Sequence, residues 1–215
     1  TPTNPVLTQA LDQLEWGDFQ ERWDAAKRLI ELGAEAIEPL IALLETEEID
    51  PELSWFIARI LGQSDRPDAI CASIDLMNST ENEEVKTMAA LTLANFGARA
   101  IEPLKLLLTQ PQWQLLGVRA LSQTQHSDAI DPLITATDNP QPEIRAAALS
   151  ALLQFRDPRI LPVLINGLQD DAAIVRREAT IGLGLQIAQM PDLLANLDAI
   201  DLLQQRLHDL DLSVC

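Results

Sequence analysis

The side chains of this sequence that could do chemistry recur at one position of a repeated five-residue motif. The motif Ala-Ile-Glu-Pro-Leu occurs at residues 36–40 and 100–104, and it returns with Asp at residues 129–133. The position before the proline, or its equivalent, is held in turn by Glu38, Cys71, Glu102, Asp131 and Leu161. Carboxylates there either stabilise the first turn of a helix through its dipole or form an acidic strip that meets a basic protein partner. Glu38, Cys71, Glu102 and Asp131 are therefore candidate partner-binding residues.

Three tryptophans are further candidates for partner binding. Trp23 and Trp55 fall at the same place in successive repeats, 32 residues apart. Two indoles placed in this way either pack between repeats or form a binding hot spot. Trp113 follows Pro111-Gln112 and is less constrained by the pattern, so we expect it to be an exposed aromatic contact.

A second recurring position carries cations. It reads Arg22, Ser54, Lys86, Leu115, Arg145 and Arg176 along the chain. We expect these cations to bind acids or carbonyl groups of the adjoining loop, which is a structural role. The alternative is an anion site, since arginine holds carboxylates in a bidentate manner.

No pattern in the sequence predicts a catalytic residue or a metal ligand. Cys71 and Cys215 lack metal-type spacing, and we expect Cys71 to be a buried, inert thiol. His126 and His208 fall in different repeats, which argues against a shared metal ion. Glycine is too sparse for a phosphate-binding loop, and Gly182-Leu-Gly184 is predicted to be a helix feature or a bend.

Composition narrows the possible partners. The chain has 33 acidic and 15 basic residues in 215, which gives a net charge of −18. This charge repels nucleic acid and anionic membranes, and it favours a protein partner with a basic patch. Two cysteines cannot build a disulfide framework, and no apolar run is long enough to span a bilayer. We therefore expect a cytoplasmic protein.

The elements that position these residues are helices arranged in repeats. Taking residues 39, 72, 103, 132 and 162 as equivalent, the steps are 33, 31, 29 and 30 residues, which is typical of a solenoid. Apolar residues recur at three and four, which indicates helices, and the motif proline suits a first helical turn. We expect one solenoid over 1–215. Its parts are a capping helix at 1–17, repeats at about 18–49, 50–79, 80–110, 111–139, 140–169 and 170–208, and the start of a truncated seventh repeat at 209–215.

Several first-helix segments resemble the V-R-x-x-A signature of HEAT repeats. They are Val85-Lys86-Thr-Met-Ala89, Ile144-Arg145-Ala-Ala-Ala148 and Val175-Arg176-Arg-Glu-Ala179. With Ala-Ile-x-Pro-Leu on the second helices, the chain is similar to the short HEAT-like repeats of the cyanobacterial phycobilisome-lyase family. The resemblance implies an all-α, α-α superhelix of about six helix pairs plus an incomplete seventh.

For function, the resemblance implies two alternatives. One is a non-catalytic scaffold or adaptor that binds a protein through a concave, acidic groove and needs no cofactor. The other is a subunit of a heteromeric bilin lyase or isomerase, which attaches phycocyanobilin to cysteines of a phycobiliprotein together with a second HEAT-like subunit. In the second case the arginines would hold the propionates of the bilin. We favour the scaffold, because the bases of this chain are few and dispersed.

Overall fold

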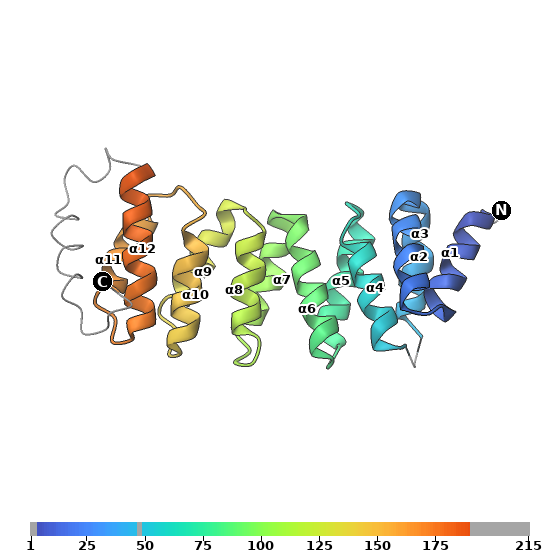
Figure 1. The fold of residues 1–215 in the computed structure, drawn as a ribbon, viewed down its shortest axis with the longest axis horizontal. Coiled ribbons are helices and arrows are strands. Elements are labelled where there is room, and N and C mark those ends of the chain that lie inside the picture. Colours follow the sequence, from blue (N-terminus) through green and yellow to red (C-terminus); the bar gives the residue numbers. More distant parts are fainter. Residues whose placement is uncertain (1–3, 47–48, 190–215) are drawn as a thin grey trace. The chain divides into compact units, whose positions relative to one another are not determined.

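The computed structural model describes residues 4–46 and 49–189, and it divides the chain into two compact units, Thr1–Leu104 and Lys105–Cys215. Within the described residues there are twelve α-helices and two 3₁₀-helices, and no β-strand (Figure 1). The all-α prediction is therefore confirmed. The second half of the predicted sixth repeat and the predicted seventh repeat lie outside the described residues.

The first unit holds one leading helix and three helix pairs, the last of which runs into the second unit. The helices are α1 (Pro5–Trp16), α2 (Phe19–Leu32), α3 (Ala34–Leu44), α4 (Pro51–Leu61), α5 (Pro67–Ser79), α6 (Glu83–Leu93), η1 (Ala94–Phe96) and α7 (Ala98–Leu108). First helices pack on first helices, as α2 on α4 and α4 on α6, and the second helices α3 and α5 pack on each other (Figure 1). The apolar core lies between these two layers and includes Leu29, Leu40, Phe56 and Ile57.

A proline and a capping box mark the starts of the first two helices of this unit. Helix α1 begins at Pro5 and packs on α2 through buried Ala10 and Leu14. Asp18 and Glu21 form a capping box, because each carboxylate accepts the backbone N–H of the other residue at 2.9 Å. These two bonds fix the start of α2 and hence the place of the aromatic side chains in its first turns.

The second unit repeats the two-layer arrangement. Its helices are α8 (Gln114–Gln123), η2 (Ser127–Ala129), α9 (Ile130–Ala136), α10 (Pro142–Leu152), α11 (Ile160–Gly167) and α12 (Ala173–Gln189). Helix α10 packs on both α8 and α12, and α11 packs on α12. Gly182 and Gly184 lie inside α12.

The predicted place of the motif proline is wrong in two repeats. Pro39 and Pro103 are the sixth residues of α3 and α7, because those helices begin directly after Gly33 and Gly97. Glu38 and Glu102 therefore lie beyond the first turn, where the helix dipole stabilises a carboxylate less. In α9 and α11 the proline is the third residue, at the predicted place.

Gly33 and Gly97 allow this early helix start. Their φ angles are +59° and +57°, with ψ near −123° and −128°, a conformation that side chains with a Cβ rarely adopt. A Cβ at either position would meet no atom within 4 Å, so the constraint comes from the backbone and not from packing.

We therefore expect Gly33→Ala to lower the free energy of unfolding by about 1–2 kcal/mol. Urea unfolding followed by circular dichroism measures this loss. Gly97→Ala is the matched variant in the third repeat and should lose a similar amount. Unchanged midpoints in both variants would show that the backbone conformation at these glycines costs nothing.

Candidate protein-binding groove

Four aromatic rings and one arginine gather on the first helices of the first unit. Phe56 of α4 contacts Phe19, Trp23 and Trp55, with ring centroids 5.5, 6.3 and 5.2 Å apart. Arg59, one turn after Trp55, places its guanidinium 4.7 Å from the Trp23 ring and 6.0 Å from the Trp55 ring. Trp23 and Trp55 thus share two neighbours, Phe56 and Arg59, and both indoles are half-buried.

A cavity opens beside this cluster. Its volume is about 600 Å³, and we call it the Trp55 groove. Its lining residues are Phe19, Asp50, Pro51, Glu52, Trp55, Asn82, Glu84 and Val85. A second cavity of about 330 Å³ continues from Trp55 onto α6, over Thr87, Met88 and Leu91. Phe19 is 58% exposed although it is large and apolar. The first unit thus presents an accessible apolar surface on adjacent first helices.

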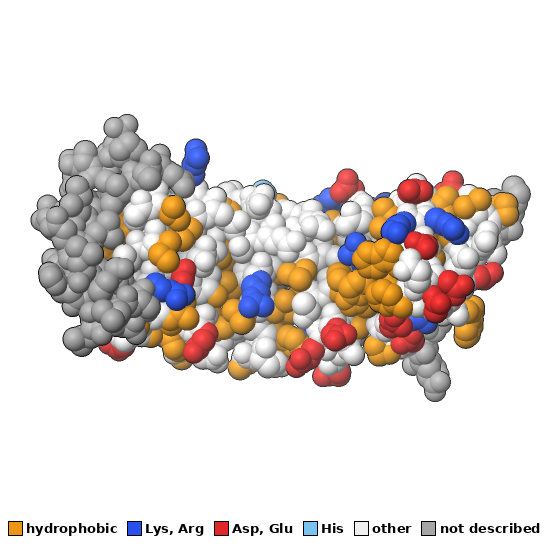
Figure 2. Space-filling model, in the orientation of Figure 1, with side chains coloured by type: hydrophobic (Ala, Val, Ile, Leu, Met, Phe, Trp, Pro, Cys, Tyr) orange, Lys and Arg blue, Asp and Glu red, His pale blue; other side chains and the backbone are white. Residues whose placement is uncertain are grey.

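Carboxylates border this surface on one side. Figure 2 shows a continuous hydrophobic patch over the region of α4, with acidic side chains below it and Lys or Arg side chains above it. Asp50 and Glu52 bind the buried Arg22 at 2.6 and 3.1 Å, and both keep nearly half of their side-chain surface exposed. The hydrogen bond from Arg22 holds the pKa of Asp50 below its usual range, against the effect of desolvation. Glu83 and Glu84 are exposed, and within the described residues neither has a cationic partner.

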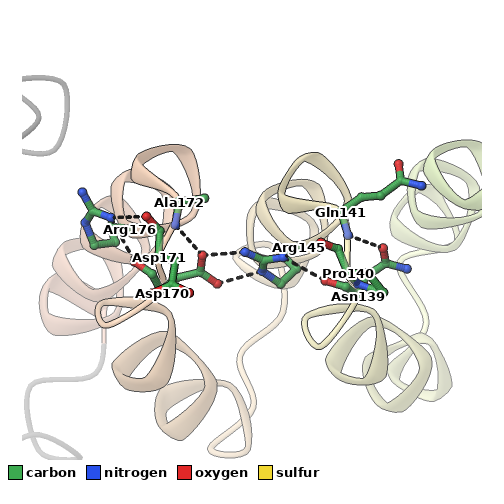
Figure 3. Close-up of polar contacts among 8 residues, drawn as sticks. All are labelled: Asn139, Pro140, Gln141, Arg145, Asp170, Asp171, Ala172 and Arg176. Atoms are coloured by element: carbon green, nitrogen blue, oxygen red, sulfur yellow. Dashed lines mark hydrogen bonds and ion pairs between the residues drawn. The ribbon is translucent and has the colours of Figure 1, made fainter.

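The predicted structural role of the recurring cations is confirmed at three positions. Arg22 binds two acids of the next repeat and the carbonyl of Glu15. Arg145 holds Asp170 through two hydrogen bonds of 2.7 and 2.6 Å, and Arg176 donates to the carbonyls of Asp170 and Asp171 (Figure 3). These guanidinium groups join loops to helices, so they are not free to hold an anionic ligand.

The structure does not gather the recurring acidic residues into the Trp55 groove. Glu38, Cys71, Glu102 and Asp131 are all exposed, but they lie on second helices. Asp131 forms an ion pair with Arg159. The predicted burial of Cys71 is wrong, because α5 buries Ala69, Ile70, Ser73 and Met77 and turns the residue between them outward.

Trp113 belongs to the second unit, where it is half-buried and precedes α8. Its role as an exposed aromatic contact stays a prediction. Phe19 and Arg59 are the functional candidates that the sequence did not single out. The signal for Arg59 was its spacing of four residues from Trp55, which puts both side chains on one face of a helix.

No three His, Cys, Asp or Glu side chains in residues 4–46 and 49–189 come close enough to hold a metal ion. In the same residues, no helix combines the length and apolar character needed to cross a bilayer.

Comparison with known proteins places the chain among helical repeats. A model described as HEAT repeats matches residues 37–117 and 110–184, and one described as the PBS lyase HEAT-like repeat matches residues 21–46. The complex of CpcE and CpcF of phycocyanin lyase from Nostoc sp. PCC7120 contains a similar structure, with 22% identity, a TM-score of 0.53, and coverage of 100% of this chain and 94% of that chain. Escherichia coli YibA is 17% identical, with a TM-score of 0.60 over 94% of this chain and 76% of that chain. No curated protein sequence matches.

Both structural likenesses are below 25% identity, so they establish the fold alone. They agree with the two-layer packing of helix pairs in each unit and with the predicted α-α solenoid. The HEAT-repeat model matches well over half of the residues of this chain, so the chain belongs to the HEAT-repeat family.

Proposed function

We propose that this chain is a non-catalytic HEAT-repeat scaffold that binds a protein partner through the Trp55 groove. The observation that carries the proposal is the accessible aromatic surface of Phe19 and Trp55 beside the exposed carboxylates Glu52 and Glu84. Tryptophan in a pocket that is desolvated on binding is the residue that most often dominates the affinity of a protein interface. The folded chain leaves this aromatic surface accessible to a partner.

The charge of the chain selects the kind of partner. Glu83 and Glu84 add two carboxylates without a cationic partner in the described part of the chain, next to two that are already shared with Arg22. The net charge of −18 repels acidic proteins at a distance and speeds the approach of basic ones. The partner we propose therefore presents an apolar anchor flanked by Lys or Arg.

We expect Trp55→Ala to weaken binding of the partner by at least about tenfold. Proteins captured on the wild-type chain are identified, and the affinity of each is then measured by isothermal titration calorimetry with the wild type and the variant. Trp113→Ala, in the second unit, is the matched control and should leave the affinity unchanged. Trp55 also packs on Phe56, so circular dichroism must show that the variant is folded.

A surface variant separates binding from folding. Glu84→Lys leaves the aromatic cluster intact and should weaken the same partner by reversing a charge at the groove. Glu38→Lys reverses an exposed charge on a second helix instead. If Glu38→Lys weakens binding and Trp55→Ala and Glu84→Lys do not, the acidic side chains of the second helices form the site and the Trp55 groove does not.

The second candidate function is a subunit of a bilin lyase. It is supported by the match of residues 21–46 to the PBS lyase HEAT-like repeat and by the likeness to the CpcE–CpcF complex of phycocyanin lyase. The chain is incubated with phycocyanobilin and an apo-phycobiliprotein, alone and with a second HEAT-like subunit. A covalent, red-shifted chromophore would replace the scaffold proposal with this one. If the apoprotein stays unmodified in every mixture, the bilin-lyase function is excluded.

A further inference from the structure

The cation that lies over the Trp55 and Trp23 rings has no acidic partner in the part of the chain that the structure describes. Arg59 is half-buried on α4, and no hydrogen bond or ion pair joins it to any described residue. The other half-buried or buried arginines that the structure describes, such as Arg22 and Arg145, bind carboxylates or carbonyl groups. Among the buried and half-buried arginines of residues 4–46 and 49–189, Arg59 is therefore the exception.

The contacts with the two indoles do not use the N–H donors of Arg59. A guanidinium that stacks on aromatic rings presents its faces to them, while its five N–H donors point outward in the plane. In the free protein these donors are hydrated. Arg59 does not line the Trp55 groove, but its guanidinium lies 6.0 Å from the Trp55 ring that does. A partner that extends from the groove along α4 therefore removes this water, and a buried guanidinium without an acceptor is costly. A partner that fits this surface therefore brings a carboxylate to Arg59.

Helix α4 sets the spacing of the charges. Glu52, Trp55 and Arg59 are separated by three and four residues, so they lie along one face of the helix. Glu52 and Arg59 are seven residues apart, which is about 10 Å along a helix axis. Along this face an acidic, an aromatic and a basic side chain therefore follow one another. A partner helix that lies along this face spans the same distance in two of its own turns, so its residues seven apart match Glu52 and Arg59. An extended chain covers this distance in about three residues.

We propose that the Trp55 groove binds an amphipathic helix of a protein partner in one polarity. The partner helix places a Lys or Arg near Glu52 and Glu84 and an apolar side chain beside Trp55. Two turns away from its own Lys or Arg, it places an Asp or Glu at Arg59. This inference rests on the proposed function, since it names the segment that the same groove takes. The charge complementarity on either side of Trp55 fixes the direction in which the helix lies.

The test is a yeast-displayed library of 18-residue amphipathic helices with a constant apolar face. Two positions seven residues apart are varied among Lys, Gln and Glu, and the library is sorted on the folded full chain. We expect helices with one Lys and one Glu, in either order because the charges alone set the direction of the helix, to be enriched at least about tenfold over helices with two Lys or two Glu. Sorting on Arg59→Glu should instead enrich Lys at the position of the selected Glu. Misfolding of the variant cannot produce such an exchange of preference.

Arg59→Met keeps the packing on the indoles without the charge, and it should abolish the preference for Glu while leaving that for Lys. If the wild type enriches basic helices with no preference at the second position, and Arg59→Glu changes nothing, the polarity is wrong and the groove still binds helices. If the wild type and Trp55→Ala enrich no helix or the same helices, the groove does not bind such segments and this inference fails, whereas the proposed function is overturned separately, by an unchanged partner affinity of Trp55→Ala.

Discussion

Arg145→Ala is expected to lower the free energy of unfolding of the second unit by about 3 kcal/mol. Arg145 donates two hydrogen bonds to the carboxylate of Asp170, and its remaining amine binds the carbonyls of Asn139 and Pro140 at 2.9 and 3.1 Å (Figure 3). The two side chains of the ion pair are only 17% and 15% exposed. Truncation therefore leaves a charged carboxylate in a largely buried place without its cation.

Urea unfolding followed by circular dichroism measures this loss. Arg145→Lys keeps the charge but loses the bidentate geometry, so we expect an intermediate loss. Arg159→Ala is the matched control, because its ion pairs with Asp131 and Asp157 involve a side chain that is 45% exposed, and it should cost less than about 1 kcal/mol. Equal losses for Arg145→Ala and Arg159→Ala would contradict the assignment of Arg145 as a clamp.

The contact between Arg145 and Asp170 should also make the unfolding free energy depend on pH. The hydrogen bonds from Arg145 hold the pKa of Asp170 below its usual value, and they outweigh the opposing effect of desolvation. The stabilisation is therefore complete above the pKa of about 4 of an unfolded Asp, and it is lost as the pH falls through the lower pKa of the folded state. We expect the difference in unfolding free energy between wild type and Arg145→Ala to be largest at pH 7 and smaller at pH 2.5. A difference that does not change with pH would exclude this linkage.

The repeat period and the spacing of apolar residues at three and four made most of the fold predictable, and the failures have local causes. The sequence placed Pro39 and Pro103 in the first turn of a helix because proline is best tolerated there. It could not show that Gly33 and Gly97, at positive φ, serve as both the end of one helix and the start of the next. Without an intervening loop, the second helix begins five residues before its proline.

The candidate site was less predictable because burial around a helix depends on which neighbours surround it. The repeat alignment found Trp23 and Trp55, and the structure brings them to one cluster. It could not show that Phe19 stays exposed or that Arg59 lies over both indoles, since these contacts join separate helices. Cys71 was misjudged for the same reason, because apolar neighbours in sequence do not determine which side of α5 is buried.

The second large effect is expected at Gly62, which ends α4 against α6. Its φ of −65° suits any residue, so the constraint is packing alone. A Cβ at this position would lie 2.4 Å from Thr92 Cβ, 2.9 Å from Thr92 Cγ2 and 3.3 Å from Thr92 Cα. The Thr92 hydroxyl donates to the carbonyls of Met88 and Ala89, which holds its side chain in place. Because Thr92 cannot turn away, α4 and α6 must separate, and we expect Gly62→Ala to cost about 3 kcal/mol.

Two further variants identify the cause of that loss in urea unfolding followed by circular dichroism. Thr92→Gly removes the obstructing atoms, so adding it to Gly62→Ala should recover part of the lost stability despite the cost of glycine in a helix. Gly184→Ala is the matched control, because a Cβ there meets nothing within 4 Å, and alanine in α12 should raise stability by about 0.5–1 kcal/mol. Since α4 carries Glu52, Trp55 and Arg59 and α6 carries Glu84, separation of the two helices should also weaken binding at the Trp55 groove. A Gly62→Ala chain with wild-type stability and wild-type partner affinity would show that the close approach of α4 and α6 does not hold this groove in shape.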